Sequence, residues 1–149
     1  MEIDYNQLKE FFSQLEIEEA MPFEYMDRPF TIWFAEYTEN ERKEGRPAIF
    51  YSFSNVDGGF DIYTPELSEI FIRPILIHEC IEALVNDERT GTGSITPKQD
   101  YIIHQRAHEL AKKYDEMYAQ DTLSPEQFIE YIKIKEEYKE ASPDSYINL

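Results

Sequence analysis

The chain has 149 residues, a formal net charge of −17, 42% hydrophobic residues and 15% aromatic residues. This length and composition predict one folded domain over residues 1–149, not a disordered chain. The negative charge argues against binding to nucleic-acid backbones and to anionic membrane surfaces, because both require clusters of Lys and Arg.

Three further features favour a cytoplasmic location. The N-terminus lacks the basic and apolar regions of a signal peptide. The sequence contains no apolar run approaching the roughly 18 residues that a membrane span needs. Cys80 has no second cysteine to pair with, which excludes an internal disulfide and fits a reducing compartment.

Hydrophobic periodicity divides the chain into an N-terminal helix, a group of strands and a series of helices. Residues 5–21 predict an amphipathic helix, with Asp4 as its N-cap and Pro22 at its end. Aromatic and β-branched residues then predict three strands, the last two joined by a tight turn at 55–59. Three helices follow, of which the first is interrupted or restarts near Pro74. The expected segments are strands 28–38, 48–54 and 60–63 and helices 67–86, 97–120 and 124–139. The predicted fold class is α+β, with a short, three-stranded antiparallel sheet packed against four helices.

The predicted helix 67–86 carries the main candidate site. Within I-L-I-H-E-C-I-E-A-L-V, His78 and Glu82 are four residues apart and share a helix face, while Glu79 points about 100° away. This is the spacing of H-E-x-x-H, with Glu in place of the last His. His104 and His108 repeat the four-residue spacing on the next helix. Because both polar pairs border the apolar faces by which the helices would pack, we expect a metal site between them.

Two imidazoles and one carboxylate suit zinc, with a fourth position left for water, and iron(II) or manganese accept the same ligands. If the two helices are antiparallel, counting residues along each puts His104 level with His78 and Glu82. His108 is then one turn deeper, as a fourth ligand or a partner that supports a ligand. Glu79 would take a proton from metal-bound water. The alternative is that the histidines lie at helix edges and form hydrogen bonds with carboxylates, with Glu79 solvated.

A short antiparallel sheet followed by a helix bearing His-Glu resembles the zincin metallopeptidase core, over about residues 28–115. By position, the resemblance implies His78 and Glu82 as zinc ligands, Glu79 as the general base, and His104 or His108 as the third ligand. The chain departs from the family at Glu82, where the family has His. A His on the later helix, where one branch of the family has Glu, would restore the set of two His and one Glu.

Two functional hypotheses follow. The first is a small cytoplasmic metal-binding protein, acting as a zinc-dependent peptidase or other hydrolase on a peptide or protein substrate. The second is a non-catalytic interaction protein whose acidic surface binds a basic partner or mimics nucleic acid. The metal content of the purified protein distinguishes between them.

Overall fold

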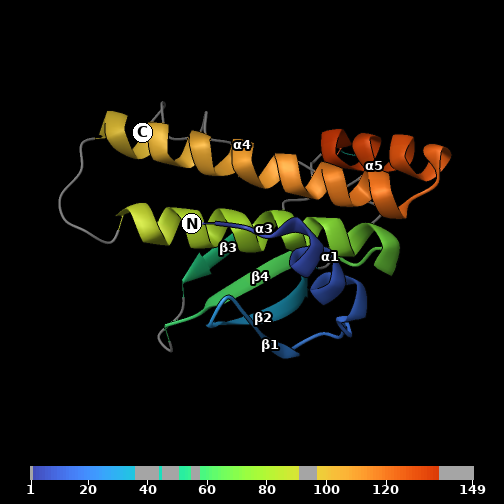
Figure 1. Ribbon diagram of the computed structural model, residues 1–149, viewed down its shortest axis with the longest axis horizontal. Helices are drawn as coiled ribbons and strands as arrows, with labels where there is room; N and C mark the ends of the chain where they lie inside the picture. The colour runs from blue at the N-terminus through green and yellow to red at the C-terminus, as the bar shows by residue number, and fades with distance from the viewer. Residues whose placement is uncertain (1, 36–43, 45–50, 55–57, 91–96, 138–149) are drawn as a thin grey trace.

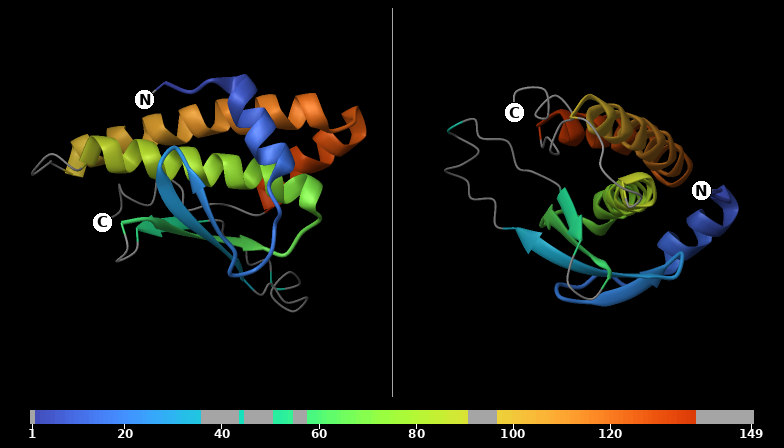
Figure 2. Two further views of the ribbon diagram at one scale, coloured as in Figure 1. Left: turned by 60° about the horizontal axis from the view of Figure 1, so that its bottom comes forward. Right: turned by 90° about the vertical axis from the view of Figure 1, so that its left-hand side faces the viewer.

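A computed structural model describes residues 2–35, 44, 51–54, 58–90 and 97–137 of the chain. These residues form α1 (Tyr5–Gln14), β1 (Pro22–Tyr25), β2 (Arg28–Ala35), β3 (Tyr51–Ser54), β4 (Phe60–Pro65), α3 (Glu69–Thr90), α4 (Pro97–Thr122) and α5 (Pro125–Glu137). Helix α3 lies against one face of the sheet, α4 lies on α3, and α5 lies beside the C-terminal half of α4 (Figures 1 and 2). The α+β class is therefore as expected.

The sheet differs from the expected three antiparallel strands. Among the described residues it has four strands in the order β1-β2-β4-β3, and its central pair, β2 and β4, is parallel. The predicted pairing of the second and third expected strands is confirmed, because β3 and β4 are antiparallel. The parallel pair arises because β3 lies at the outer edge, so that β4 returns between β3 and β2.

Strand β1 is the additional strand, and a two-residue turn joins it to β2. Tyr25 pairs with Arg28, and the two residues between them, Met26 and Asp27, both have positive φ angles of 51° and 63°. Positive φ at both central positions is the requirement of a type I′ hairpin turn. The sequence gives no glycine to indicate such a turn, which explains why this strand was not expected.

Helix α1 begins where the sequence predicts and ends earlier. The side chain of Asp4 accepts a hydrogen bond from the backbone N–H of Gln7, which confirms the N-cap. The helix ends at Gln14 and not near residue 21. Further along, the backbone pairs with β2: the N–H of Ala20 donates to Ile32, and the N–H of Ile32 donates to Met21. These bonds to the sheet replace a helical continuation.

Helix α3 is continuous through Pro74, so the expected interruption there is wrong. It also continues to Thr90, beyond the expected end at Asn86. Helix α4 begins at Pro97, as predicted. Helix α5 begins after a reciprocal cap, in which the N–H of Gln127 donates to the Ser124 hydroxyl and the N–H of Ser124 donates to the Gln127 side chain. Some of the expected elements extend beyond the described residues. These are the strand ends at 36–38 and 48–50, the turn residues 55–57 and the helix end at 138–139. The connection between helices at 91–96 also lies outside the described residues.

Two groups of buried apolar side chains hold these layers together. The main core cluster joins the inner face of the sheet to α1, α3 and α4, and it includes Phe12, Phe30, Ile62 and Ile81. The second core cluster is smaller and joins α3, α4 and α5. Its buried members are Phe71, Ile75, Ala119, Leu123 and Tyr131. Within the described residues, none of the helices has the length and apolar character needed to cross a membrane.

Candidate metal centre

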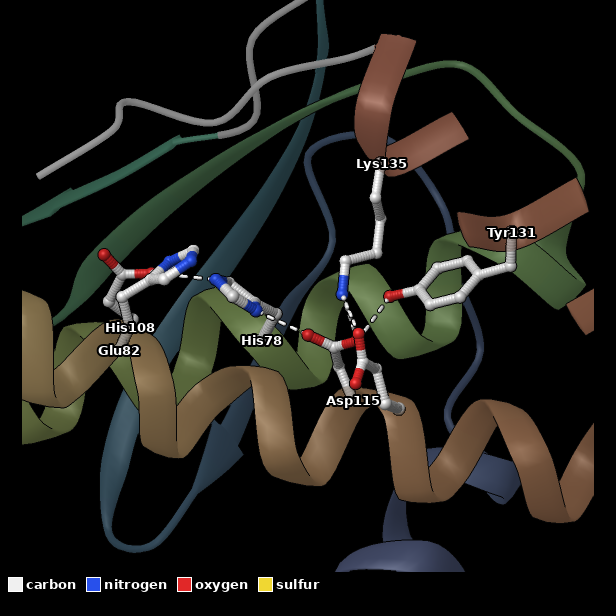
Figure 3. A network of polar contacts seen from close by, with 7 residues as sticks. His78, Glu82, His108, Asp115, Tyr131 and Lys135 are labelled. Carbon is white, nitrogen blue, oxygen red and sulfur yellow. Dashed lines mark hydrogen bonds and ion pairs between the residues drawn. The ribbon is translucent and has the colours of Figure 1, made fainter. Parts of the chain in front are cut away.

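Three of the expected metal ligands lie together between α3 and α4. His78 and Glu82 are on successive turns of α3, and His108 reaches them from α4 (Figure 3). Nε2 of His78 is 2.9 Å from Oε2 of Glu82, and Nδ1 of His108 is 3.7 Å from the same oxygen. One donor atom from each residue lies within 4.8 Å of the other two. The site thus presents two imidazole nitrogens and one carboxylate oxygen to a single point.

These separations fit a metal ion. Zinc bonds nitrogen and oxygen ligands at about 2.0–2.1 Å, so two ligands of a tetrahedral ion lie about 3.3 Å apart. The two separations to Glu82, 2.9 and 3.7 Å, lie on either side of that value, and all three donor atoms lie within 4.8 Å of one another.

A fourth residue, Asp115 of α4, holds His78 from the opposite side. Its Oδ2 lies 2.5 Å from Nδ1 of His78. Its Oδ1 accepts hydrogen bonds from the Tyr131 hydroxyl at 2.9 Å and from Nζ of Lys135 at 2.8 Å, both on α5 (Figure 3). The Asp115 side chain is 0% exposed. The carboxylate accepts from Nδ1 of His78, which leaves the lone pair of Nε2 directed at Glu82 and His108 in the neutral ring.

A protonated His78 that donates to two carboxylates is the alternative account of the short contact to Glu82. Oε2 of Glu82 is buried, and Nε2 of His78 and Nδ1 of His108 both lie near it. A protonated imidazole would hold this oxygen in an ion pair. A metal ion bound by two neutral imidazoles and the carboxylate would hold the same three atoms together.

The expected level of the two later histidines is wrong, because the structure groups His108, and not His104, with His78 and Glu82. Helix α3 ends at Thr90, four residues beyond Asn86, and four residues are about 6 Å, or one turn. Because α3 is one turn longer than expected, the His78–Glu82 pair lies beside His108 on α4 and not beside His104. His104 instead has its Nε2 3.1 Å from Oδ1 of Asp100, one turn earlier on the same helix.

Glu79, the expected general base, is buried and lies outside the group of candidate ligands. Glu79 is 3% exposed, so the alternative of a solvated side chain is wrong. Its carboxylate contributes no atom to the group formed by His78, Glu82 and His108. Cys80 is a buried core residue, and burial, with a smaller contribution from Glu79, raises the pKa of its thiol well above the usual value.

A cleft of about 260 Å³ leads to this group of residues between α3, α4 and α5. His78 and His108 form part of its wall, and Asp115, Tyr131 and Lys135 form another part. Ile75 and Ile132 supply apolar surface. A small molecule or one side chain of a larger substrate could therefore reach two of the three candidate ligands from solvent.

The sequence pattern identified the candidate ligands and missed the residues that support them. Asp115 follows His108 by seven residues, which is two turns on the same helix face, and this spacing was a usable signal. Tyr131 and Lys135 are four apart on α5, but the Lys-Glu-Glu run beginning at Lys135 is typical of a solvated face.

Comparison of the chain with models of protein families, with curated proteins and with solved structures found no match in any of the three.

Proposed function

We propose that this chain is a metalloprotein that binds one zinc ion through His78, Glu82 and His108 and uses it for hydrolysis. The observation that carries the proposal is the convergence of three donor atoms within 4.8 Å, with Asp115 behind His78. Iron(II) or manganese would suit the same ligand set. A zincin-like relationship and a peptide substrate are part of the proposal, and they rest on the H-E-x-x-E spacing in the sequence.

Hydrolysis is the chemistry that fits such a centre. A zinc ion with three protein ligands keeps a position for water and lowers the pKa of that water to about 7. The cleft reaches His78 and His108, so a substrate has an approach to the same point. His78 is held in one orientation by Asp115, which preserves the geometry of the ligand set.

Metal binding is the first test. The purified chain should carry about one zinc ion, and saturating zinc at about 100 times its dissociation constant should raise the free energy of unfolding by about 2.7 kcal/mol. His78→Ala, Glu82→Gln and His108→Ala should each reduce the metal content measured by elemental analysis. A wild-type chain that neither contains zinc nor binds added zinc would overturn the proposal.

Glu79 provides the second test, because it separates binding from chemistry. If Glu79 accepts a proton from water, Glu79→Gln should retain zinc and lose hydrolysis of a peptide library. Zinc loss equal to that of Glu82→Gln would instead make Glu79 part of the binding site. Retained hydrolysis would assign the base elsewhere.

The net charge of −17 supports a second candidate, a cytoplasmic interaction protein that binds a basic partner. Such binding should weaken steeply as the salt concentration rises, because exposed charges are screened. The discriminating experiment is a pull-down at low and high salt with zinc-loaded and metal-free protein. A salt-sensitive partner bound equally by His78→Ala would favour this second function.

A further inference from the structure

We infer that Lys135 and Tyr131 of α5 strengthen the metal centre through Asp115, so that metal binding and the docking of α5 stabilise each other. This inference rests on the proposed function, because it concerns the metal that His78, Glu82 and His108 would bind. Both residues direct their polar groups to Asp115, on the side of His78 away from Glu82 and His108 (Figure 3). Both are therefore positioning residues and not ligands.

The geometry of Asp115 supplies the connection. Each of its two oxygens serves a different element: Oδ2 lies against Nδ1 of His78 on α3, and Oδ1 accepts from Tyr131 and Lys135 on α5. With both donors of α5 in place, the carboxylate has a single orientation, in which Oδ2 faces the ring of His78. That orientation fixes the direction of the other ring nitrogen, Nε2, toward Glu82 and His108.

Of the two α5 residues that contact Asp115, Lys135 should stabilise the carboxylate more than Tyr131, because Lys135 carries a positive charge. A fully buried carboxylate is costly unless it is paired. The Lys135 side chain is 19% exposed and lies 2.8 Å from Asp115 and 3.3 Å from Glu116. Lys135 is thus the cation that compensates the buried charge, and it comes from the helix that also walls the cleft. Tyr131 adds a neutral donor to the same oxygen.

The coupling must act in both directions. If docked α5 raises the affinity for the metal, bound metal must favour docked α5 by the same factor. Apart from the polar contacts, the described part of α5 is held by the second core cluster, through Tyr131 and the partly buried Phe128, Ile132 and Ile134. This cluster is small, so the contribution of the Asp115 network to docking should be measurable.

The affinity for zinc in the full chain is the primary measurement, by competition with a chelating dye. Lys135→Met and Tyr131→Phe should each weaken binding by on the order of tenfold, the lower end for residues that support a ligand. Lys135→Arg should retain most of the affinity, since it keeps the charge. Lys133→Met is the matched control: it makes the same change on the same helix at an exposed position, and it should bind zinc as the wild type does.

Hydrogen exchange of the α5 backbone amides supplies the second measurement. Zinc should slow exchange in residues 125–137 of the wild type, and it should do so less in Asp115→Asn, which weakens the connection between His78 and α5. If Lys135→Met does not fold, Tyr131→Phe carries the affinity test, because it removes only one hydroxyl group.

The outcomes separate the inference from the proposed function. A wild-type chain that does not bind zinc refutes the proposed function and the inference together. A chain that binds zinc, with Tyr131→Phe and folded Lys135→Met as tight as Lys133→Met and with exchange in α5 unaffected by zinc, overturns the inference alone. Weakened binding in these variants, retained in Lys133→Met, supports it.

Discussion

The two core clusters of this protein differ in size and in the polar groups that border them. The main core cluster lies between the sheet and the helices, and the hydroxyl group of its Tyr118 forms a hydrogen bond with the neutral hydroxyl group of Ser13. The second core cluster lies between α3, α4 and α5, and its Tyr131 donates a hydrogen bond to the buried charge of Asp115. Asp115 in turn contacts His78 and Lys135. The charged groups are thus concentrated where the apolar core is small.

This contrast indicates that the two regions serve different purposes. Burial of apolar surface is the dominant favourable term in folding, so the main core cluster should set the stability of the fold. A buried ion pair is weak evidence for stability, because well-packed apolar residues often stabilise as much or more. The network around Asp115 is therefore better explained by a site than by stability, which agrees with its position beside the candidate metal centre.

The largest expected effect comes from opening a cavity in the main core cluster. Phe30 on β2 is fully buried. Its ring stacks on Phe23 of β1 and Phe60 of β4, with ring centroids 5.4 and 5.3 Å apart. Phe30→Ala should lower the free energy of unfolding by about 3–5 kcal/mol, measured by urea denaturation. Leu123→Ala, at the edge of the second core cluster, should cost less, roughly 2 kcal/mol. An equal or larger loss at Leu123 would contradict the division of roles between the clusters.

An intermediate effect is expected from Asp115→Asn. Removing one partner of a buried ion pair typically costs about 3–5 kcal/mol. Here Lys135 can still reach Glu116, so we expect about 2 kcal/mol in metal-free protein. The neighbouring Glu116→Gln is the control, because its side chain is 31% exposed and should contribute less than about 1 kcal/mol. Equal losses in thermal or urea unfolding would mean that burial of Asp115 is not what matters.

The parts of the fold that the sequence predicted are those with local signals. Asp4 marks the start of α1, Pro97 that of α4, and Ser124 that of α5. Two features had no local signal. The turn at Met26–Asp27 adopts positive φ without glycine, and the parallel pairing of β2 with β4 depends on where β3 lies in the sheet. Long-range pairing of this kind cannot be deduced from the period of each strand alone.

The candidate site shows the same distinction between local spacing and tertiary placement. The four-residue spacing placed His78 and Glu82 on one face of α3, and the structure brings them together. The choice between the two later histidines depended on the end of α3, which helix patterns locate only to within a few residues. Asp115 lies in a charged stretch, and its burial is set by α5 packing over it.

The smallest expected effect is that of His104→Ala, and it tests the placement of the site directly. The Nε2 of His104 lies 3.1 Å from Asp100, in a pair that is 18% and 32% exposed. Pairs of this spacing on a helix surface contribute about 0.3–0.5 kcal/mol, so the free energy of unfolding should fall by no more than that. The zinc affinity should change by less than about twofold, because His104 supplies no atom to the candidate centre.

His108→Ala is the matched comparison on the same helix, one turn later. It makes the same substitution and removes the nitrogen that lies 3.7 Å from Glu82. Its loss of zinc affinity should exceed that of His104→Ala by at least about tenfold, because it removes a proposed ligand, whereas His104 lies outside the proposed ligand set. The reverse order would place the metal one turn nearer the start of α4, where it could no longer share His78 with Asp115. In that case the short contact between His78 and Glu82 would be an ion pair, and the buried network would be structural.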